Sequence, residues 1–558
     1  MEFKKNDVVT IQIEDMSQEG LGIGKADGYA LFVKDTVIGD QARVRITKTK
    51  KNYGFARLEE LLRASELRAE PACPLARPCG GCQLQMVKYA EQLRWKEQKV
   101  RSNLQRLGNF TEIPMEPIQG MESPFRYRNK AQFPVGYDRD GKLVAGFYAG
   151  RTHAIIPVKD CLLGDDVNQE ILQRVLDWMR EHKISAYRED TGKGLVRHIL
   201  IRSGFSTGEV MVCLVVNGER VPCADSLVET LVEVRGMTSI VYSPNTRQTN
   251  VILGDSYHIL WGQGFITDCI GAVRYRISPL SFYQINPVQT KRLYETALDY
   301  AGLTGKEIVY DLYCGIGTIS LFLAQKARKV YGVEIVPQAV EDARKNAAIN
   351  GITNAEFFAG KSEEILPCHY REKQIRADVV VVDPPRKGCD ESLLQTIVEM
   401  EPEKVVYVSC DPATLARDLK YLCGRGYRLE RVKAFDQFPQ TVHVETVVLL
   451  SHKKPDSTIS VKVEFGEGEG KVPLDNIAKR AEAYKPKERV TYKMIKEYIE
   501  AKYGFKVHTA YIAEVKRSLG LPMYDAPNAV EELKQPRKHP TAEKVEAIKG
   551  ALRYFGVI

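Results

Sequence analysis

The sequence predicts a multidomain α/β protein with an OB-like β-barrel, a β-rich domain, a Rossmann-like domain and a helical carboxy-terminal extension. After residue 285, apolar runs of strand length alternate with helix-length segments, which is typical of a parallel sheet flanked by helices. Before residue 286 the apolar runs are short and separated by glycine-rich turns, which indicates β-structure. The predicted domains are 1–65, 66–285 and 286–452, followed by a linker at 453–480 and the helical extension at 481–558.

The composition is that of an ordinary globular protein. Of the 558 residues, 44% are hydrophobic and 27% are charged, which fits a folded chain and argues against a disordered one. No apolar run reaches the length of a membrane span, and the first residues, MEFKKND, lack the core of a signal peptide. We therefore expect a cytoplasmic monomer with no membrane partner. The net charge of +8 permits a nucleic-acid partner, and the twelve cysteines indicate a metal site or a reactive thiol.

The first domain is predicted to be a small β-barrel. Short alternating strands at Val8–Ile13, Tyr29–Val33 and Gln41–Thr47 are separated by glycine turns. Basic residues alternate along the third strand, and Tyr53 and Phe55 follow among further cations. Barrels of this kind hold single-stranded nucleic acid with cations and stacking rings, so we expect RNA contact. The alternative is a solvated strand edge whose lysines prevent aggregation.

Clustered cysteines at the start of the second domain indicate a metal site. Cys73, Cys79 and Cys82 lie in CPLARPCGGC, where proline and glycine let the backbone fold round an ion. Cys161, in a turn-like stretch, is the best candidate for a fourth thiolate. Tetrahedral zinc and an iron–sulfur cluster are both compatible with four thiolates. Residues 125–133 alternate cations with aromatic or amide groups, which fits either an RNA-facing strand or a polar sheet face.

The third domain contains a nucleotide-binding pattern. A helix from Pro287 precedes a strand that runs into a tight turn with Gly315 and Gly317, where glycine lets the backbone approach a ligand. No phosphate-loop lysine follows, so pyrophosphate is not the expected ligand. The next strand ends in Glu334, about twenty residues beyond the turn, where an acid can accept from ribose hydroxyls. With Asp383 ending a further strand, the pattern predicts S-adenosylmethionine.

A cysteine follows a predicted buried strand in this alternating region of strands and helices. Val405–Val408 is an apolar run that reads as a buried strand, and Ser409-Cys410-Asp411-Pro412 ends it. Such sheets place their chemistry at the carboxyl ends of strands, and the thiolate of Cys410 would be a nucleophile. The alternative is a small core residue, because free cysteine is often buried. Glu445 begins the final strand, where it is either a base with a raised pKa or an exposed charge.

The motifs together resemble one family. FYQINP, DLYCGIGT, VEI, VVDPPRKG, VSCDPATLARD and FPQTVHVETVVLL are similar to the S-adenosylmethionine-dependent RNA uracil-5-methyltransferases. With CPLARPCGGC and a TRAM-like first domain, the chain most resembles the iron–sulfur 23S ribosomal RNA (uracil-5)-methyltransferases over residues 1–452. The resemblance implies a [4Fe–4S] cluster and a cofactor site. The implied cluster ligands are Cys73, Cys79, Cys82 and Cys161, and the implied cofactor residues include Gln284, Tyr313, Glu334 and Asp383. Lys361 departs from the expected amide or acidic residue, which leaves the adenine-side contact open.

The implied reaction requires a thiol and a base. Uracil C5 is too weak a nucleophile to take a methyl group unaided, but a thiolate that adds at C6 makes C5 an enolate carbon. We predict Cys410 as the nucleophile and Glu445 as the base that then removes the C5 proton, with 23S ribosomal RNA as the expected substrate. The target must be flipped out or unpaired to be reached. The rivals are a transfer RNA uracil-5-methyltransferase, an exocyclic amino-methyltransferase and a non-enzymatic iron–sulfur RNA-binding regulator.

The extension is predicted to be helical. Amphipathic segments at Thr491–Tyr503 and His508–Leu519 are joined by a short turn with glycine, a helix-turn-helix pattern. The alternative is a docked helical hairpin with solvated lysines. A final helix is predicted near Ala542–Tyr554. The family that the motifs resemble does not require this extension, and the sequence assigns it no role.

Overall fold

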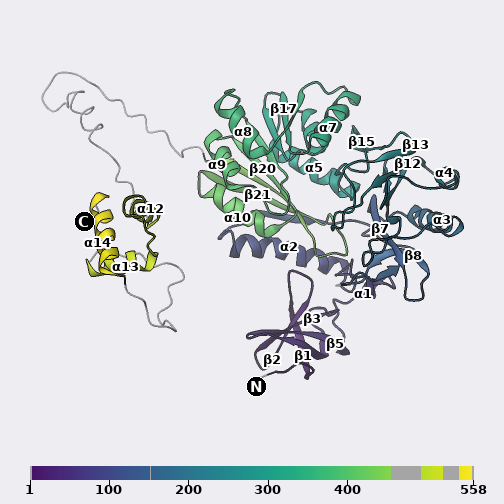
Figure 1. Ribbon diagram of the computed structural model, residues 1–558, viewed down its shortest axis with the longest axis horizontal. Helices are drawn as coiled ribbons and strands as arrows, with labels where there is room; N and C mark the ends of the chain where they lie inside the picture. Colours follow the sequence, from purple (N-terminus) through teal and green to yellow (C-terminus); the bar gives the residue numbers. More distant parts are fainter. Residues whose placement is uncertain (1–2, 151, 454–491, 520–539, 556–558) are drawn as a thin grey trace. The chain divides into compact units, whose positions relative to one another are not determined.

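The computed structural model describes residues 3–150, 152–453, 492–519 and 540–555 (Figure 1). It divides into two compact units, Met1–Asp456 and Ser457–Ile558. Within the described ranges, no helix is long and apolar enough to cross a membrane. Apart from its first residue, the predicted linker at 453–480 lies outside the described residues.

The amino-terminal domain is a closed barrel with the strand order β1-β2-β3-β5-β4, as the sequence predicts. Its strands are β1 (Val8–Met16), β2 (Gly22–Ala26), β3 (Tyr29–Lys34), β4 (Gln41–Thr49) and β5 (Tyr53–Arg63). Alternate side chains of these strands point inward, and Ile13, Leu31 and Val44 are among those that fill the core.

The central domain is built on a seven-stranded sheet in the order β13-β12-β11-β10-β7-β8-β9. The strands are β7 (Lys130–Tyr137), β8 (Leu143–Tyr148), β9 (Ile155–Pro157), β10 (Val196–Ser203), β11 (Val210–Val216), β12 (Met237–Pro244) and β13 (His258–Gly262). Two helices that the sequence analysis did not predict, α3 (Val167–Glu181) and α4 (Ala224–Val232), share its core. On α3 the buried residues Ile171, Val175 and Met179 recur every four positions, which is the helical repeat.

The third domain contains an eight-stranded sheet in the order β18-β17-β16-β19-β20-β22-β21-β6. Its strands are β6 (Met115–Gln119), β16 (Ile308–Leu312), β17 (Lys329–Glu334), β18 (Ala355–Ala359), β19 (Val379–Val382), β20 (Lys404–Ser409), β21 (Tyr427–Phe435) and β22 (Glu445–His452). The helices are α5 (Pro287–Ala301), α6 (Thr318–Ala324), α7 (Pro337–Ile349), α8 (Ser362–Arg371), α9 (Glu391–Met400) and α10 (Pro412–Cys423). The strands from β18 to β20 are parallel, and the strand order reverses between β16 and β19. Open α/β sheets bind ligands at such a switch point, outside the carboxyl ends of the strands.

The boundary predicted at residue 285 cuts through this domain. Strand β6 pairs in parallel with β21, and α2 (Tyr89–Arg106) contributes Val100 and Leu104 to the core of the sheet. The hairpin of β14 (Ile266–Ile270) and β15 (Val273–Ile277) packs against α6 and α7. The sequence analysis placed all three segments in the central domain. Their long-range pairing leaves no mark on the local pattern of apolar residues.

The second unit consists of three helices in the described residues. They are α12 (Tyr492–Tyr503), α13 (Thr509–Ser518) and α14 (Ala542–Tyr554), within two residues of the predicted bounds. Ile495, Ile499, Ile512, Ile548 and Leu552 belong to a core that these helices share.

Candidate active site

One cavity of about 730 Å³ lies at the carboxyl ends of the parallel strands. Its volume is in the usual range of a cofactor site. Among the residues that line it are Gln284, Tyr313, Gly315, Glu334, Asp383, Cys410 and Glu445. Every predicted catalytic and cofactor residue except Gly317 therefore borders the same space.

Strand register brings the cofactor residues together. Leu312 at the end of β16 pairs with Val333 of β17 and with Val382 of β19. The next residue of each strand, namely Tyr313, Glu334 and Asp383, therefore starts at the same edge of the sheet. These three residues are far apart in the sequence, and the register of the strands makes them neighbours.

The turn after β16 orients Glu334. Tyr313 adopts φ +70°, an uncommon conformation for a residue other than glycine, and its N–H and that of Cys314 both donate to Val333 O. The Gly315 N–H donates to Glu334 Oε2 at 3.1 Å, and the Val336 N–H donates to Oε1 at 2.9 Å. A Cβ on Gly315, at φ +56°, would meet nothing within 4 Å. The carboxylate is thus held by backbone donors beside open space, as a ribose-binding acid requires.

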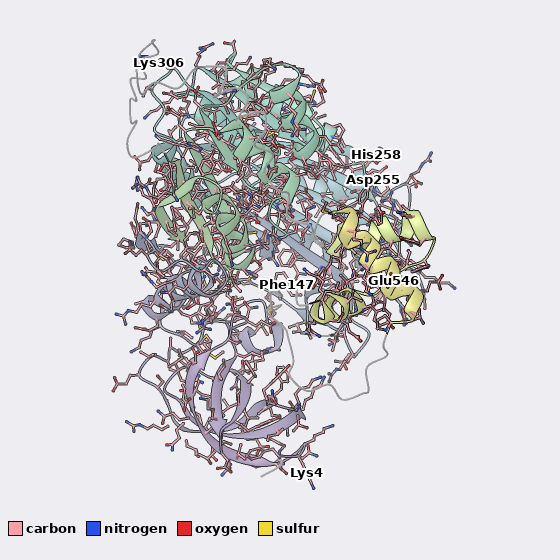
Figure 2. All side chains as sticks on the ribbon, turned by 90° about the vertical axis from the view of Figure 1, so that its left-hand side faces the viewer. Lys4, Phe147, Asp255, His258, Lys306 and Glu546 are labelled. Atoms are coloured by element: carbon pink, nitrogen blue, oxygen red, sulfur yellow. The ribbon has the colours of Figure 1, made fainter. Side chains whose placement is uncertain are left out.

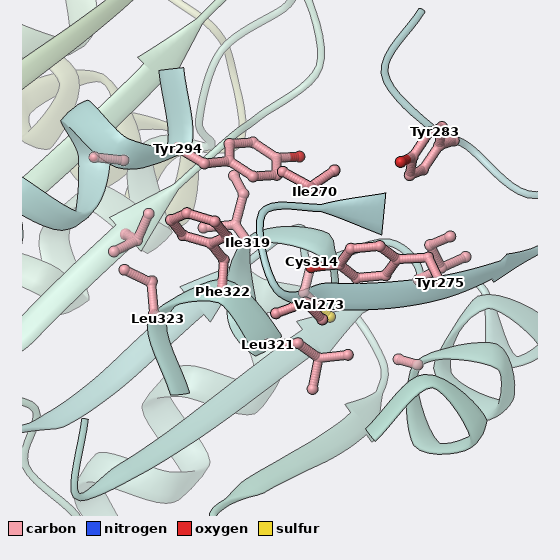
Figure 3. Packing of buried hydrophobic residues seen from close by; sticks show 14 of the residues in the cluster. Ile270, Val273, Tyr275, Tyr283, Tyr294, Cys314, Ile319, Leu321, Phe322 and Leu323 are labelled. Atoms are coloured by element: carbon pink, nitrogen blue, oxygen red, sulfur yellow. The ribbon is translucent and has the colours of Figure 1, made fainter. Parts of the chain in front are cut away.

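Gly317 has a packing role in this structure. At φ +82°, a Cβ on this residue would lie 3.1 Å from the ring of Phe357, so the position suits glycine alone. The helix α6 begins at the next residue, Thr318, and two buried rings fix that start (Figure 3). The Tyr275 hydroxyl donates to Thr318 O at 2.9 Å and the Tyr294 hydroxyl to Oγ1 at 2.8 Å.

Antiparallel register places Cys410 beside Glu445. Strands β20 and β22 pair up to Ser409 and Thr446, so Cys410 and Glu445 are one step further along the same ladder. Residues opposite each other in such a ladder have Cα atoms about 5 Å apart. Asp411 then caps α10, because its carboxylate accepts from the backbone N–H of the second and third residues that follow.

Burial raises the pKa of three acidic groups that line the cavity, namely Asp383, Cys410 and Glu445. Burial alone raises the pKa of Asp383 to about 7. Burial and the neighbouring Asp383 raise the pKa of Glu445 well above its usual range. Burial, then Glu445 and Asp383, raise the pKa of Cys410 to about 12. Perturbation of this kind is typical of catalytic groups that share a cavity.

Arg386 counteracts these shifts. Its guanidinium lowers the pKa of both Cys410 and Glu445, which favours the thiolate and the carboxylate. The sequence analysis quoted Arg386 within DPPRKG and gave it no role. His443 and Arg128 also line the cavity. Burial and nearby cations lower the pKa of His443 to about 4, so the imidazole is neutral at pH 7.

The central domain supplies one wall of the cavity. Within the stretch 125–133, Arg128 lines the cavity, whereas Phe133 is buried in the core of its own domain. Asn129 binds the cofactor-side loop, because its side-chain amide donates to Gln284 O at 3.0 Å and its backbone N–H donates to Ile285 O at 3.0 Å. The stretch is therefore neither a continuous RNA-facing strand nor a plain polar sheet face.

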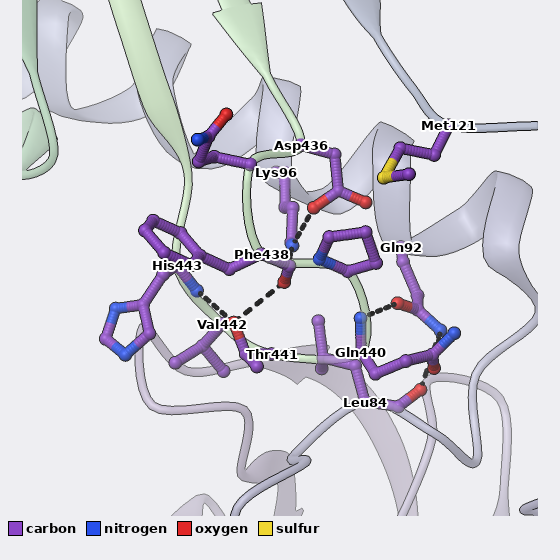
Figure 4. A network of polar contacts seen from close by, with 12 residues as sticks. Leu84, Gln92, Lys96, Met121, Asp436, Phe438, Gln440, Thr441, Val442 and His443 are labelled. Atoms are coloured by element: carbon purple, nitrogen blue, oxygen red, sulfur yellow. Dashed lines mark hydrogen bonds and ion pairs between the residues drawn. The ribbon is translucent and has the colours of Figure 1, made fainter. Parts of the chain in front are cut away.

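A buried polar network holds the segment that leads to Glu445 (Figure 4). Lys96 on α2 forms an ion pair with Asp436, and both side chains are fully buried. Lys96 Nζ also donates to Phe438 O at 3.0 Å, and the Tyr89 hydroxyl donates to Asp436 Oδ2 at 2.8 Å. Phe438 lines the cavity. The bonds from α2 to Asp436 and Phe438 therefore hold one wall of the cavity, although α2 lies outside the parallel sheet.

We expect Lys96→Met to lower the free energy of unfolding by about 3–5 kcal/mol, because it leaves the Asp436 carboxylate buried without its counterion. Urea denaturation followed by circular dichroism measures this loss. The matched control is Lys345→Met, which removes an exposed partner of Asp342 and should cost less than about 1 kcal/mol. Equal losses in the two variants would contradict the assigned importance of the buried pair.

The four predicted cluster ligands border a second, small cavity. Cys73, Cys79, Cys82 and Cys161 line a space of about 30 Å³, and Phe147 is one of the apolar residues that border it. Figure 2 labels the position of Phe147 in the molecule. No group of three or more His, Cys, Asp or Glu residues in the described ranges is arranged to hold a metal ion. The four thiols thus border one cavity.

The segment that carries Cys73, Cys79 and Cys82 contacts the segment that precedes Glu445. The Leu84 N–H donates to Gln440 O at 3.0 Å, and the Val442 N–H donates to the side chain of Gln83 at 3.4 Å. Arg126 binds the loop of Cys161, donating to Cys161 O at 3.2 Å and to Asp160. The shape of the cysteine cavity is therefore coupled to the position of the residues that precede Glu445.

Known proteins share this organisation. A tRNA (uracil-5-)-methyltransferase family model matches residues 266–453, and a TRAM domain model matches residues 2–58. An uncharacterized RNA methyltransferase from Halalkalibacterium halodurans is 49% identical over 450 residues, which cover 80% of this chain and 98% of that protein. A similar relative from Clostridium acetobutylicum is 49% identical and is covered to 97%.

A solved structure also resembles the chain over most of its length. The crystal structure of the Pyrococcus abyssi tRNA (uracil-54, C5)-methyltransferase in complex with S-adenosyl-L-homocysteine matches with a TM-score of 0.64 and 29% identity. The match covers 79% of this chain and 99% of that one. The chain therefore belongs to the S-adenosylmethionine-dependent RNA (uracil-5-)methyltransferase family and carries an amino-terminal TRAM domain.

Proposed function

We propose that this enzyme methylates C5 of a specific uridine in 23S ribosomal RNA through a covalent bond between Cys410 and C6 of the base. The observation that supports this most is the ladder register that puts the Cys410 thiol beside the Glu445 carboxylate at the cofactor cavity. A nucleophile next to a base with a raised pKa is the pair that addition followed by elimination requires.

The cavity fits S-adenosylmethionine. Glu334 would hold the ribose hydroxyls, and the backbone at Gly315 leaves room for a close approach. Tyr313, Gln284 and Asp383 would line the rest of the site. When bound, the cofactor supplies a methyl group on a positively charged sulfonium, which makes that carbon an electrophile.

The residues of the chain account for each bond change on the base. The Cys410 thiolate forms the S–C6 bond, and the electron pair of the C5–C6 double bond moves toward O4 as an enolate. After C5 has gained the methyl group, the Glu445 carboxylate removes the C5 proton. The C5–C6 double bond then forms again and the S–C6 bond breaks, which returns Cys410 as a thiolate. Glu445 passes the proton to solvent. The products would therefore be the methylated base, S-adenosylhomocysteine as the leaving group of the methyl transfer, and one proton.

The barrel provides a groove that suits single-stranded RNA. Phe32, Phe55 and Lys34 line a cavity of about 510 Å³ that also borders the cysteine segment at Gly80. The rings of Phe32 and Phe55 have centroids 5.7 Å apart, and Tyr53 stands edge-on to both. Stacking rings beside a cation are the features by which such barrels bind unpaired bases.

Two RNA classes are candidates for the substrate. The four-cysteine cavity beside a TRAM domain favours 23S ribosomal RNA, because the motif resembles the iron–sulfur enzymes that modify it. The similarity to the Pyrococcus abyssi tRNA (uracil-54, C5)-methyltransferase favours transfer RNA. The test is to incubate the enzyme and cofactor separately with unmodified 23S RNA and with unmodified transfer RNA, and then to analyse the nucleosides by mass spectrometry.

We expect 5-methyluridine in the 23S RNA and none in the transfer RNA. Methylation of the transfer RNA alone would reject the ribosomal assignment and retain the chemistry. A methyl group on an exocyclic amine of either RNA would reject methylation at C5 itself.

We further propose that Cys73, Cys79, Cys82 and Cys161 hold a [4Fe–4S] cluster. Four thiols around one cavity are the donor set that such a cluster needs. Four thiolates are also compatible with a tetrahedral zinc ion, and the assay for iron and sulfide distinguishes the two groups. Metal binding of this kind stabilises the fold, so the cluster would fix the contacts of Leu84 with Gln440.

Cys161→Ala should abolish cluster binding, because it removes one of four thiolates. The protein is purified without oxygen and assayed for iron, acid-labile sulfide and melting temperature. We expect the wild type to contain equal iron and sulfide, and the variant to contain little of either and to melt at a lower temperature. Cys223→Ala, at an exposed cysteine, is the matched control. Retention of iron and sulfide in Cys161→Ala, or zinc in the wild type, would refute the assignment.

A further inference from the structure

The carboxy-terminal unit has no counterpart in the bacterial relatives described above. Those relatives are covered to 97–98% of their length by about 450 residues of this chain. The family model that matches the methyltransferase domain ends at residue 453. The unit Ser457–Ile558 is therefore an addition to the catalytic protein, and neither the family nor the active site assigns it a role.

An exposed ring stack lies on this unit. The rings of Tyr498 on α12 and Tyr554 at the end of α14 are stacked, with centroids 4.4 Å apart and an angle of 27° between their planes. Phe555 stands edge-on to Tyr554 at 5.1 Å. Tyr554 nevertheless remains 68% exposed, which is the largest exposed fraction among the large hydrophobic side chains that stand out on the surface. One face of this ring is covered by Tyr498 and the other is open to a further planar group.

Cations stand beside the same rings. Lys502 Nζ donates to the Tyr498 hydroxyl at 2.7 Å and lies 5.2 Å and 5.7 Å from the ring centroids of Tyr498 and Tyr503. The Tyr503 hydroxyl reaches α14, because a Cβ on Gly550 would lie 2.7 Å from it. Arg553 is exposed and precedes Tyr554 directly. Helices α12 and α14 thus present rings and cations on a common surface.

The charge of the unit indicates an anionic partner. From Ser457 to Ile558 the sequence has 19 Lys and Arg residues against 14 Asp and Glu residues. The unit therefore contributes five of the eight net positive charges of the whole chain, although it makes up less than a fifth of the length. An apolar partner would require apolar residues around the rings, whereas the Lys502 ammonium lies beside two of them.

We propose that Tyr498, Lys502, Tyr503 and Tyr554 form an RNA-binding surface for an unpaired segment. A base stacks on the exposed ring of Tyr554, and Lys502 binds the adjacent phosphate. This surface is separate from the methylation site and independent of which uridine is methylated. Because it is linked covalently to the catalytic unit, it raises the local concentration of RNA for that unit.

The test uses the full-length chain and a fluorescein-labelled short oligoadenylate, which contains no uracil and thus no methylation target. Fluorescence anisotropy measures the dissociation constant over a range of salt concentrations, without S-adenosylmethionine. We expect Tyr554→Ala and Tyr554→Leu to weaken binding about tenfold, and Tyr554→Trp to retain it, because stacking requires a ring. A plot of the logarithm of the association constant against the logarithm of the salt concentration has a negative slope. We expect Lys502→Gln to reduce the magnitude of this slope by about 0.7 and Lys502→Arg to preserve it.

Lys544→Gln is the matched control. Lys544 also lies over a tyrosine ring, that of Tyr511, but it stands near the start of α14, about 15 Å along the helix from Tyr554. We expect this variant to bind the oligoadenylate with the dissociation constant of the wild type, because the ring of Tyr554 is unchanged. Wild-type affinity in Tyr554→Ala would overturn the proposal. Equal affinity of Tyr554→Leu and Tyr554→Trp would overturn it in favour of an apolar docking surface for a protein.

The methylation assay provides an independent readout. With the 23S RNA substrate, Tyr554→Ala should raise KM and leave kcat within about twofold, because the base on Tyr554 is not the base that reacts. A fall in kcat with an unchanged KM would reject the proposed role. Because the oligoadenylate experiment involves no methyl transfer, its outcome does not depend on whether the proposed uridine chemistry is correct.

Discussion

Cys410→Ala is expected to lower methyl transfer by at least about a thousandfold, because it removes the thiol that we propose adds, as its thiolate, to C6 of the base. The same variant should form no covalent complex with RNA in which uracil is replaced by 5-fluorouracil. Fluorine at C5 cannot be removed as a proton is, so the wild-type enzyme should stay attached to this RNA after methyl transfer. The complex is detected as a band of reduced mobility on a denaturing gel.

A second buried thiol provides the control for Cys410. Cys389 is buried beneath the DPPRKG turn and does not line the cavity, so Cys389→Ala should form the complex as the wild type does. Substantial methyl transfer by Cys410→Ala would exclude the covalent route. Absence of the complex in the wild type, together with normal methylation of ordinary RNA, would exclude it as well.

Glu445→Gln is expected to stop turnover after the methyl group has been added. Glutamine fills the same volume at this buried position, 4% exposed, but it cannot accept the C5 proton. The variant should therefore accumulate a methylated covalent adduct with ordinary, unfluorinated RNA. Loss of a general base lowers the turnover rate by about 10²–10⁴-fold. Denaturing gels and mass spectrometry of the adduct measure this accumulation.

The pH dependence supplies a second test of Glu445. The base works only as a carboxylate, and burial with Asp383 raises its pKa well above the usual range. Turnover of the wild type should therefore rise with pH until this group has lost its proton, and it should fall as pH drops below that raised pKa. Glu430→Gln, on the neighbouring β21 and away from the cavity, should keep the wild-type profile. Full turnover without an adduct in Glu445→Gln would assign the base elsewhere.

The local pattern of apolar and turn-forming residues is sufficient to predict much of the fold. Alternating apolar residues bounded by glycine turns predicted the strands of the barrel, because only one face of each strand is buried there. Near-continuous apolar runs predicted the strands of the parallel sheet, because these strands are buried on both faces. Strand β17 begins at Lys329 and helix α5 begins at Pro287, as the sequence predicts. The start of the helix is predictable because Pro287 and the cap Asn286 act within its first turn. Because Glu334, Asp383 and Cys410 each stand at the end of a predicted strand, the sequence also predicts that they lie at one edge of the sheet.

By itself the sequence thus determined the residue types, their place at the ends of strands and the resemblance to one methyltransferase family. Only the tertiary structure decided that the strand register brings Glu445 beside Cys410, that Arg386 lowers the pKa of both, and that β6 completes the sheet. The physical reason is that pairing register and charge–charge distance depend on contacts between distant segments. Apolar periodicity records which face of a segment is buried, and it does not record against which other segment that face is packed.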